Sequence, residues 1–259
     1  MNVFEKIIQK IEAPEENKTV NEIEKVEKWK NKRVGKITAS QLPKFMQRGR
    51  KRGEVFGKEA IKVLIQTKGE MRIGESFDQE IESFEMRWGK ENEFLALQKV
   101  KEKYPNIKGG SEGKEISFRI YKNIFGSSPD FEGEKLTGEI KCPVSRVKIE
   151  MERDHINFIK QDEKGKFSYH EYFWQIVGHL IANPKAEKCI YVIYDAYVDE
   201  AYFHELKRID VLGEISDLKK RLDIAEKAIE ASKNDGWKNK RILNINENLF
   251  IYQNENNKK

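Results

Sequence analysis

The sequence predicts an α/β (α+β) fold in which a central mixed β-sheet is flanked by helices. Side chains alternate between apolar and polar along residues 114–122 and 136–142, as they do in strands, and the apolar run 189–195 is followed by a hairpin partner over 197–206. Apolar residues recur at helical spacing over residues 83–104, 168–184 and 212–232. The 259-residue chain is 38% hydrophobic and 10% aromatic, which is enough for a substantial core.

We expect one globular domain made of three parts. Residues 1–30 form an N-terminal helical extension, residues 31–212 the core, and residues 213–259 a C-terminal helix and tail. In the extension, helical spacing over residues 3–11 ends at Pro14, and a second helix begins at the capping box of residues 19–22. The other faces of these helices are highly charged, which favours a solvated face on a packing or oligomer-contact helix.

Charge and cysteine content narrow the function classes. Lys and Arg number 49 against 44 for Asp and Glu, and this net charge of +5 permits DNA binding without requiring it. Two cysteines exclude a disulfide framework and a four-cysteine zinc or iron–sulfur site. The absence of a long apolar run and of a signal-peptide pattern predicts a cytoplasmic protein without a membrane association.

The stretch from residue 127 to residue 143 carries the pattern of a hydrolytic site. Alternation places Glu139 and Lys141 on one face of a strand and Ile140 in the core. We expect Asp130 at the tip of a Gly-rich hairpin that folds back and brings its carboxylate to Glu139 and Lys141. Carboxylate oxygens suit a hard cation, and an adjacent lysine can orient the attacking water or balance developing negative charge.

Basic residues gather in two places near the start of the core. Residues 33–40 form a basic turn that leads into a helix near Gln41. There Arg33 can bind a phosphate through two hydrogen bonds, and Ser40 can add a third from its hydroxyl. The alternative is that Ser40 only caps the helix. The densest basic cluster, Arg48–Arg52, either follows a DNA backbone or is a solvated loop.

Two of the predicted helices carry further candidate residues. In the helix over 83–104, Glu91 and Glu93 lie two positions apart, so at most one of them faces the hairpin. In the helix over 168–184, His170 and His179 lie nine positions apart without a set of Cys or His neighbours, which favours structural or surface roles. The predicted core residues of this second helix are Trp174, Ile176, Val177 and Leu180.

The motifs together resemble a known superfamily. Ser-Pro-Asp at 128–130 and Gly-Glu-Ile-Lys-Cys-Pro at 138–143 resemble the core motif of the PD-(D/E)XK nucleases, and more narrowly that of phage lambda exonuclease and the YqaJ-like viral recombinases. Residues 33–40, 88–93 and 172–175 resemble three further motifs of those proteins in the same order. The resemblance implies a restriction-endonuclease-like core.

The resemblance also implies roles for individual residues. The catalytic residues would be Asp130, Glu139 and Lys141. Magnesium or manganese would be held by Glu93, Asp130, Glu139 and the backbone carbonyl of Ile140. The 5′-phosphate and the DNA end would be bound by Arg33, Ser40 and Gln175.

Two positions depart from the family pattern. Ile120 stands where an acidic residue is expected, which leaves Glu112 and Glu115 as nearby candidates for a further metal ligand. Val177 stands where many relatives carry a second glutamine.

The function implied is a magnesium-dependent 5′-3′ exonuclease. It would digest linear double-stranded DNA from 5′-phosphorylated ends and leave 3′ overhangs for a single-strand annealing protein in phage-type recombination. A homo-oligomer, a trimer by resemblance, would act in the bacterial or phage-infected cell. The alternatives are an endonuclease of the same superfamily, a non-catalytic DNA-end-binding protein, and a structural protein in which these charges form a surface network.

Overall fold

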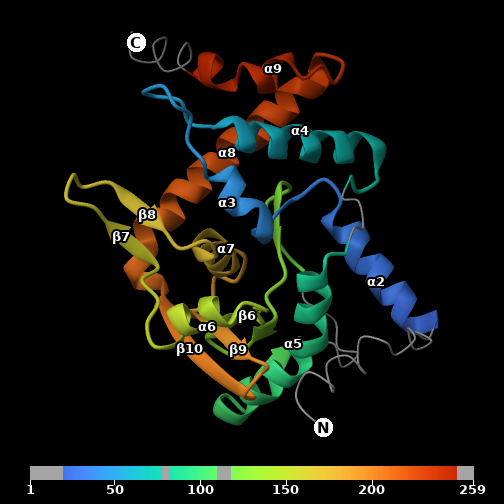
Figure 1. Cartoon of the computed structure of the whole chain (residues 1–259). Helices are drawn as coiled ribbons and strands as arrows, with labels where there is room; N and C mark the ends of the chain where they lie inside the picture. The colour runs from blue at the N-terminus through green and yellow to red at the C-terminus, as the bar shows by residue number, and fades with distance from the viewer. Residues whose placement is uncertain (1–19, 78–81, 110–117, 250–259) are drawn as a thin grey trace.

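The computed structural model describes residues 20–77, 82–109 and 118–249, with the side chains of residues 20–26 left aside (Figure 1). The helices are α2 (Val20–Arg33), η1 (Ala39–Gln41), α3 (Leu42–Phe45), α4 (Lys58–Ile73), α5 (Phe84–Lys103), α6 (Arg146–Arg153), α7 (Phe173–Ala182), η2 (Arg208–Val211), α8 (Leu212–Asn234) and α9 (Lys240–Leu243). The strands are β1 (Ile37–Thr38), β2 (Lys108–Gly109), β3 (Arg119–Tyr121), β4 (Phe125–Ser127), β5 (Phe131–Glu132), β6 (Leu136–Lys141), β7 (Ile159–Gln161), β8 (Phe167–Tyr169), β9 (Lys188–Asp195) and β10 (Glu200–Lys207).

The main sheet is mixed and has the strand order β10-β9-β6-β5-β2. Strands β6 and β9 pair in parallel, because the chain between them runs through α6 and α7 before it returns, and every other pair in this sheet is antiparallel. A sheet of this kind flanked by helices is the predicted fold class, which is confirmed. The expected pairing of strand 189–195 with its following partner is also confirmed, since β9 and β10 pair along their whole length.

Helices α5 and α7 cover opposite faces of this sheet (Figure 1). On the α5 face, Leu97 and Val100 pack with Ile140 of β6 and Val192 of β9. On the α7 face, Phe173 and its neighbours join a larger core that also contains side chains of α3, α4 and α8. Because both faces are covered, the alternate residues of β6 are buried in either direction, and a polar residue such as Glu139 must find its partners inside the protein.

Helix α7 lies in the middle of the molecule and is buried almost all round (Figure 1). Its predicted core residues are indeed buried. Gly178 permits this position, since a Cβ there would lie 2.5 Å from Leu42 Cδ1 and 3.0 Å from Phe125 Cζ. The helix therefore packs closely against α3 and β4, and β4 belongs to a second sheet of order β1-β4-β3.

Several predictions need correction. The helix expected over 168–184 begins only at Phe173, because residues 167–169 pair with β7 in a hairpin that periodicity did not predict. In the strand expected over 114–122, β3 forms the described end, but Ile120 is 52% exposed and does not belong to a core face. In the helix over 83–104, Phe84 and Leu95 belong to the apolar residues that recur at helical spacing, but both are exposed.

Other predictions fall outside the described residues. These are the helix over 3–11, the capping-box residue Thr19, the candidates Glu112 and Glu115, and the C-terminal tail. The domain boundaries after residues 30 and 212 stay predictions. Over the part of the chain that the structure describes, no helix combines the length and the apolarity needed to cross a membrane.

Candidate active site

Asp130 lies at the open end of the β5–β6 hairpin. Its backbone N–H donates to the carbonyl of Gly138 (2.9 Å), and its Oδ2 accepts from the backbone N–H of Ile140 (2.6 Å). The turn itself is closed by Gly133 N–H, which donates to the carbonyl of Leu136 (2.9 Å). The expectation that Asp130 forms the hairpin tip is therefore wrong. The register of the hairpin nevertheless brings its carboxylate to the end of β6, where Glu139 and Lys141 lie.

Glu139 is 3% exposed and both of its carboxylate oxygens accept hydrogen bonds. Oε1 accepts from Lys141 Nζ and from Gln175 Nε2, each at 2.5 Å. Oε2 lies 2.7 Å from His179 Nε2. The sequence predicted Lys141 on the same strand face as Glu139, and the structure brings the two together. The contact of Gln175 with Glu139 was not predicted, and His179 was given no functional role.

His179 is the residue of this site whose observed environment differs most from the prediction. Its side chain is completely buried, and its Nδ1 lies 2.6 Å from Ser127 Oγ on β4. One signal in the sequence could have found it. Gln175 and His179 are four residues apart on a helix and so share one face, which means that a helix presenting Gln175 to Glu139 also presents His179.

The ammonium of Lys141 is enclosed by the site. Nζ lies 4.8 Å from the centre of the Tyr172 ring, in addition to its bond to Glu139. Burial acts to lower the pKa of Lys141, but the carboxylates of Glu139 and Asp130 outweigh it, and the pKa lies above its ordinary value. Lys141 is therefore a firmly charged cation rather than a proton acceptor at neutral pH.

The carboxylates around Lys141 repel one another, and the single ammonium does not balance them all. Burial, followed by the charges of Glu139 and Glu93, raises the pKa of Asp130 well above its ordinary value. Burial and the charge of Glu139 likewise raise the pKa of Glu93. Glu139 is the exception, because Lys141 and the bond to His179 overcome the effect of burial and lower its pKa to about 2.

These groups fit a hard cation by their chemistry. Glu93 on α5 is half-buried, whereas Glu91 is exposed, so one glutamate of the pair faces the site as expected. Asp130, Glu139 and Glu93 offer only oxygen, which magnesium and manganese prefer, and a cation would relieve the repulsion that raises two of their pKa values. Among the described residues, the carboxylates of Glu93, Asp130 and Glu139 do not bring one oxygen each to within 4.8 Å of the other two.

Arg33 and Ser40 line one hollow of about 370 Å³. Lys44 of α3 and Lys62 of α4 also line it, together with Glu59, which pairs with Lys62 (2.8 Å). Ser40 is exposed and does not cap a helix. The N-cap of η1 is Thr38, whose backbone N–H donates to Gln41 Oε1 (3.0 Å), and the capping alternative for Ser40 is therefore wrong.

The hollow is tied directly to the carboxylate site. The Arg33 guanidinium lies 4.2 Å from the centre of the Trp29 ring. Trp29 Nε1 in turn donates to Ser128 Oγ (3.0 Å), two residues before Asp130. The basic cluster Arg48–Arg52 lies elsewhere, in an exposed turn between α3 and α4 that is anchored by the ion pair of Arg48 with Asp217 (3.2 Å).

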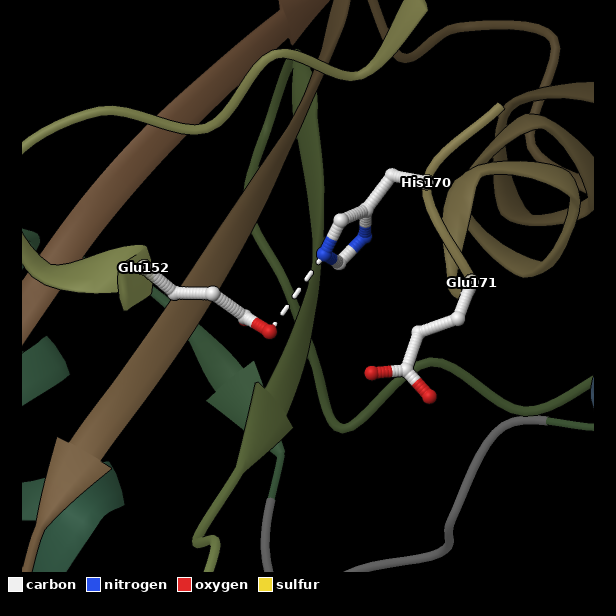
Figure 2. A group of neighbouring side chains, drawn as sticks. All are labelled: Glu152, His170 and Glu171. Carbon is white, nitrogen blue, oxygen red and sulfur yellow. Dashed lines mark ion pairs between the residues drawn. The ribbon is translucent and has the colours of Figure 1, made fainter. Parts of the chain in front are cut away.

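A second group of acidic and histidine side chains, Glu152, His170 and Glu171, lies near Tyr172, whose ring is 5.8 Å from that of His170 (Figure 2). Figure 2 shows the Glu152 carboxylate facing the imidazole of His170, with Glu152 Oε1 at 3.4 Å from His170 Nε2, and Glu171 beside them. Glu152 also accepts from the Tyr191 hydroxyl (3.1 Å), and Glu171 is paired with Lys148. This group ties α6 to the segment that leads into α7, and its charges are already compensated.

A mixed sheet with a helix on each face, and two acids and a lysine at the β5–β6 hairpin, defines a nuclease of the PD-(D/E)XK superfamily. Residues 28–185 match the model of the YqaJ-like viral recombinase domain, so the chain belongs to that family. This confirms the resemblance on which the residue roles were based.

Solved structures agree with this assignment at the level of the fold. An alkaline exonuclease from Laribacter hongkongensis is 21% identical, with a TM-score of 0.59, and the match covers 81% of this chain and 97% of that one. The same exonuclease in complex with dAMP gives 23% identity, the same TM-score and the same coverage. Among curated proteins, no sequence matches.

Proposed function

We propose that the chain is a divalent-metal-dependent exonuclease that digests linear double-stranded DNA from 5′-phosphorylated ends and leaves 3′ single-stranded overhangs. The observation that carries this proposal is the link from the Arg33–Ser40 hollow, through Trp29 and Ser128, to Asp130. These contacts connect a pocket that has cationic side chains for a terminal phosphate with the residues that have the chemistry for hydrolysis. The exonuclease activity named for the structural relative supports the same proposal.

Magnesium or manganese would be held by the carboxylates of Asp130, Glu139 and Glu93 and by the backbone carbonyl of Ile140. When bound, such a cation polarises the phosphodiester and lowers the pKa of a coordinated water. The protein's own contribution is to hold the carboxylates in place, which the bond from Ile140 to Asp130 and the three bonds to Glu139 do.

Lys141 supplies the positive charge of the protein at the reacting phosphate. Its ammonium is fixed between Glu139 and the Tyr172 ring, so it does not have to reorganise as negative charge develops on the phosphate oxygens. Gln175 donates to the same oxygen of Glu139 as Lys141, and in this proposal it also contacts the DNA end. These roles make Asp130, Glu139 and Lys141 the catalytic residues of the proposal.

End selection is a separate binding function. A guanidinium binds a phosphate through two parallel hydrogen bonds, and Arg33 lies in the hollow with Ser40, whose hydroxyl is exposed. Lys44 adds positive charge that favours the dianionic terminal phosphate over an internal one, whereas the charge of Lys62 is balanced by its ion pair with Glu59. A 5′-hydroxyl end lacks that charge and should bind less tightly.

The remaining parts of the proposal concern context. The 3′ overhang would be taken up by a single-strand annealing protein in phage-type recombination, in the cytoplasm of a bacterial or phage-infected cell. A homo-oligomer, a trimer, would keep the enzyme on its substrate. Sedimentation that gives a monomer at micromolar concentration would contradict the oligomer.

The test is digestion of linear duplexes with 5′-phosphate or 5′-hydroxyl ends, beside a closed circle, with magnesium or with EDTA. The proposal predicts loss of the phosphorylated linear duplex first, and only with the metal. Cutting of the circle would indicate an endonuclease. DNA binding without any cutting would indicate a non-catalytic end-binding protein.

A further inference from the structure

The hydrogen bonds of Glu139 leave one acceptor position open. An ionised carboxylate accepts about four hydrogen bonds or ligand bonds, two on each oxygen. Lys141 and Gln175 occupy both positions of Oε1, and His179 occupies one position of Oε2. The remaining position is therefore on the oxygen that His179 binds, and the direction in which it points depends on where the imidazole lies.

His179 holds that oxygen through the N–H on Nε2. Lys141 Nζ and Gln175 Nε2 can only donate, so Glu139 is the acceptor of this group of bonds, and Nε2 of His179 donates to Oε2. In a neutral imidazole the other nitrogen, Nδ1, is then an acceptor, and the hydroxyl of Ser127 at 2.6 Å is its donor. Ser127 is itself buried on β4, so water does not replace it.

The backbone around the imidazole is fixed from three sides. Glu139 lies on β6 of the main sheet, His179 on α7 and Ser127 on β4 of the second sheet. Gly178 allows α7 to approach β4 closely. The imidazole therefore has one position and one orientation in which both of its nitrogens are paired.

We propose that His179 is a positioning residue that orients Glu139 for a divalent cation, and that Ser127 sets the tautomer of His179 that does so. The inference deepens the proposed function and rests on it for the identity of the cation, but not for the geometry. Residues behind a metal ligand that fix its orientation commonly change the affinity for the metal about 10- to 100-fold when they are replaced.

The experiment compares four variants by calorimetric titration of Mn²⁺ into the full chain, with thermal unfolding as a check on folding. His179→Leu removes the donor and keeps an apolar volume, whereas His179→Gln restores an N–H donor. Ser127→Ala removes the hydroxyl that pairs with Nδ1 of His179. Ile176→Val is the matched control, since it also removes buried volume from α7 without touching Glu139.

We expect His179→Leu to weaken Mn²⁺ binding about 10-fold or more, Ser127→Ala to weaken it by a smaller factor, and His179→Gln to recover most of the loss. Ile176→Val should lower the Tm and leave the affinity unchanged. If His179 had only a structural role, the affinity for Mn²⁺ would instead follow the Tm across all four variants. That result would overturn the proposal.

Other outcomes are equally decisive. Wild-type affinity in folded His179→Leu, or no Mn²⁺ binding by the wild type, also overturns the proposal. If His179→Leu does not fold, Ser127→Ala decides, and wild-type affinity in that variant overturns the tautomer role. The proposed function fails separately, when the wild type binds Mn²⁺ with the expected variant pattern but digests no DNA.

Discussion

Two clusters of acidic side chains lie near Tyr172, and they differ in how their charges are balanced. Lys141 and Lys148 approach the same ring, at 4.8 Å and 4.7 Å from its centre. On the Lys141 side, the pKa values of Asp130 and Glu93 are raised, first by burial and then by neighbouring carboxylates. On the Lys148 side, burial opposes a lowered pKa of Glu152, but the hydrogen bond from His170 prevails.

The difference indicates which of the two clusters suits a cation better. Proximity of ligand atoms favours the Glu152 cluster, since its three ligand atoms lie within 4.8 Å of one another. Charge balance favours the Asp130 cluster, because its carboxylates raise each other's pKa while those of the other cluster are paired with Lys148, His170 and a tyrosine hydroxyl. We give charge balance the greater weight, since a protein without excess negative charge at a site gains little from a bound metal.

The largest expected effect separates the two lysines. Lys141→Ala should lower the rate of cleavage by about 10²-fold or more, because it removes the charge beside the reacting phosphate. DNA binding should change little, since one ammonium contributes a small part of the affinity for the backbone. Lys148→Ala, which removes the other lysine near the same ring, is the control and should retain cleavage. Equal losses in both variants, measured as single-turnover rates, would contradict the distinction.

A smaller effect is expected in end selection. Arg33→Ala should reduce the preference for 5′-phosphate over 5′-hydroxyl ends by about 10-fold, because the variant loses one charge-assisted hydrogen-bonding group. Arg48→Ala is the matched arginine outside the hollow and should keep the preference, whatever it does to total DNA affinity. The ratio of initial digestion rates on the two duplexes measures this. A full preference in Arg33→Ala would remove the residue from the pocket.

The smallest effect tests the balanced cluster. The pKa of Glu152 in the folded protein is lowered from 4.5, so its interactions contribute stability above that value and lose it as the pH falls through the folded pKa. Glu152→Gln should therefore lower the Tm by a few degrees at pH 7, for the loss of about 1 kcal/mol of charge-assisted hydrogen bonding, and by less near pH 3. A Tm difference that is the same at both pH values would contradict the account.

The sequence predicted the strands and helices that are strongly periodic. Strand 136–141, the α5 helix and the β9–β10 pair follow from alternation or helical spacing, because burial on one or two sides imposes those periods. The prediction failed where pairing between separate segments determines the secondary structure. Residues 167–169 look like the start of a helix, but they pair with residues 159–161, and only the folded chain supplies that partner.

The sequence predicted the residues of the candidate site, but not the residue that supports them. Asp130, Glu139, Lys141 and Gln175 were identified by motif, and the structure brings them together. The role of His179 depends on the approach of α7 to both sheets, which the chain brings about through contacts 40 and 52 residues apart in sequence. No local pattern records such contacts.

The measurement that tests the central claim most directly is calorimetric titration of Mn²⁺ into the wild type, Asp130→Asn and Glu152→Gln. Each variant removes one negative charge with little change of shape, from one cluster or the other. The account predicts that Asp130→Asn loses the binding and that Glu152→Gln retains it. Binding that survives Asp130→Asn and is lost in Glu152→Gln would place the cation in the other cluster and contradict the account.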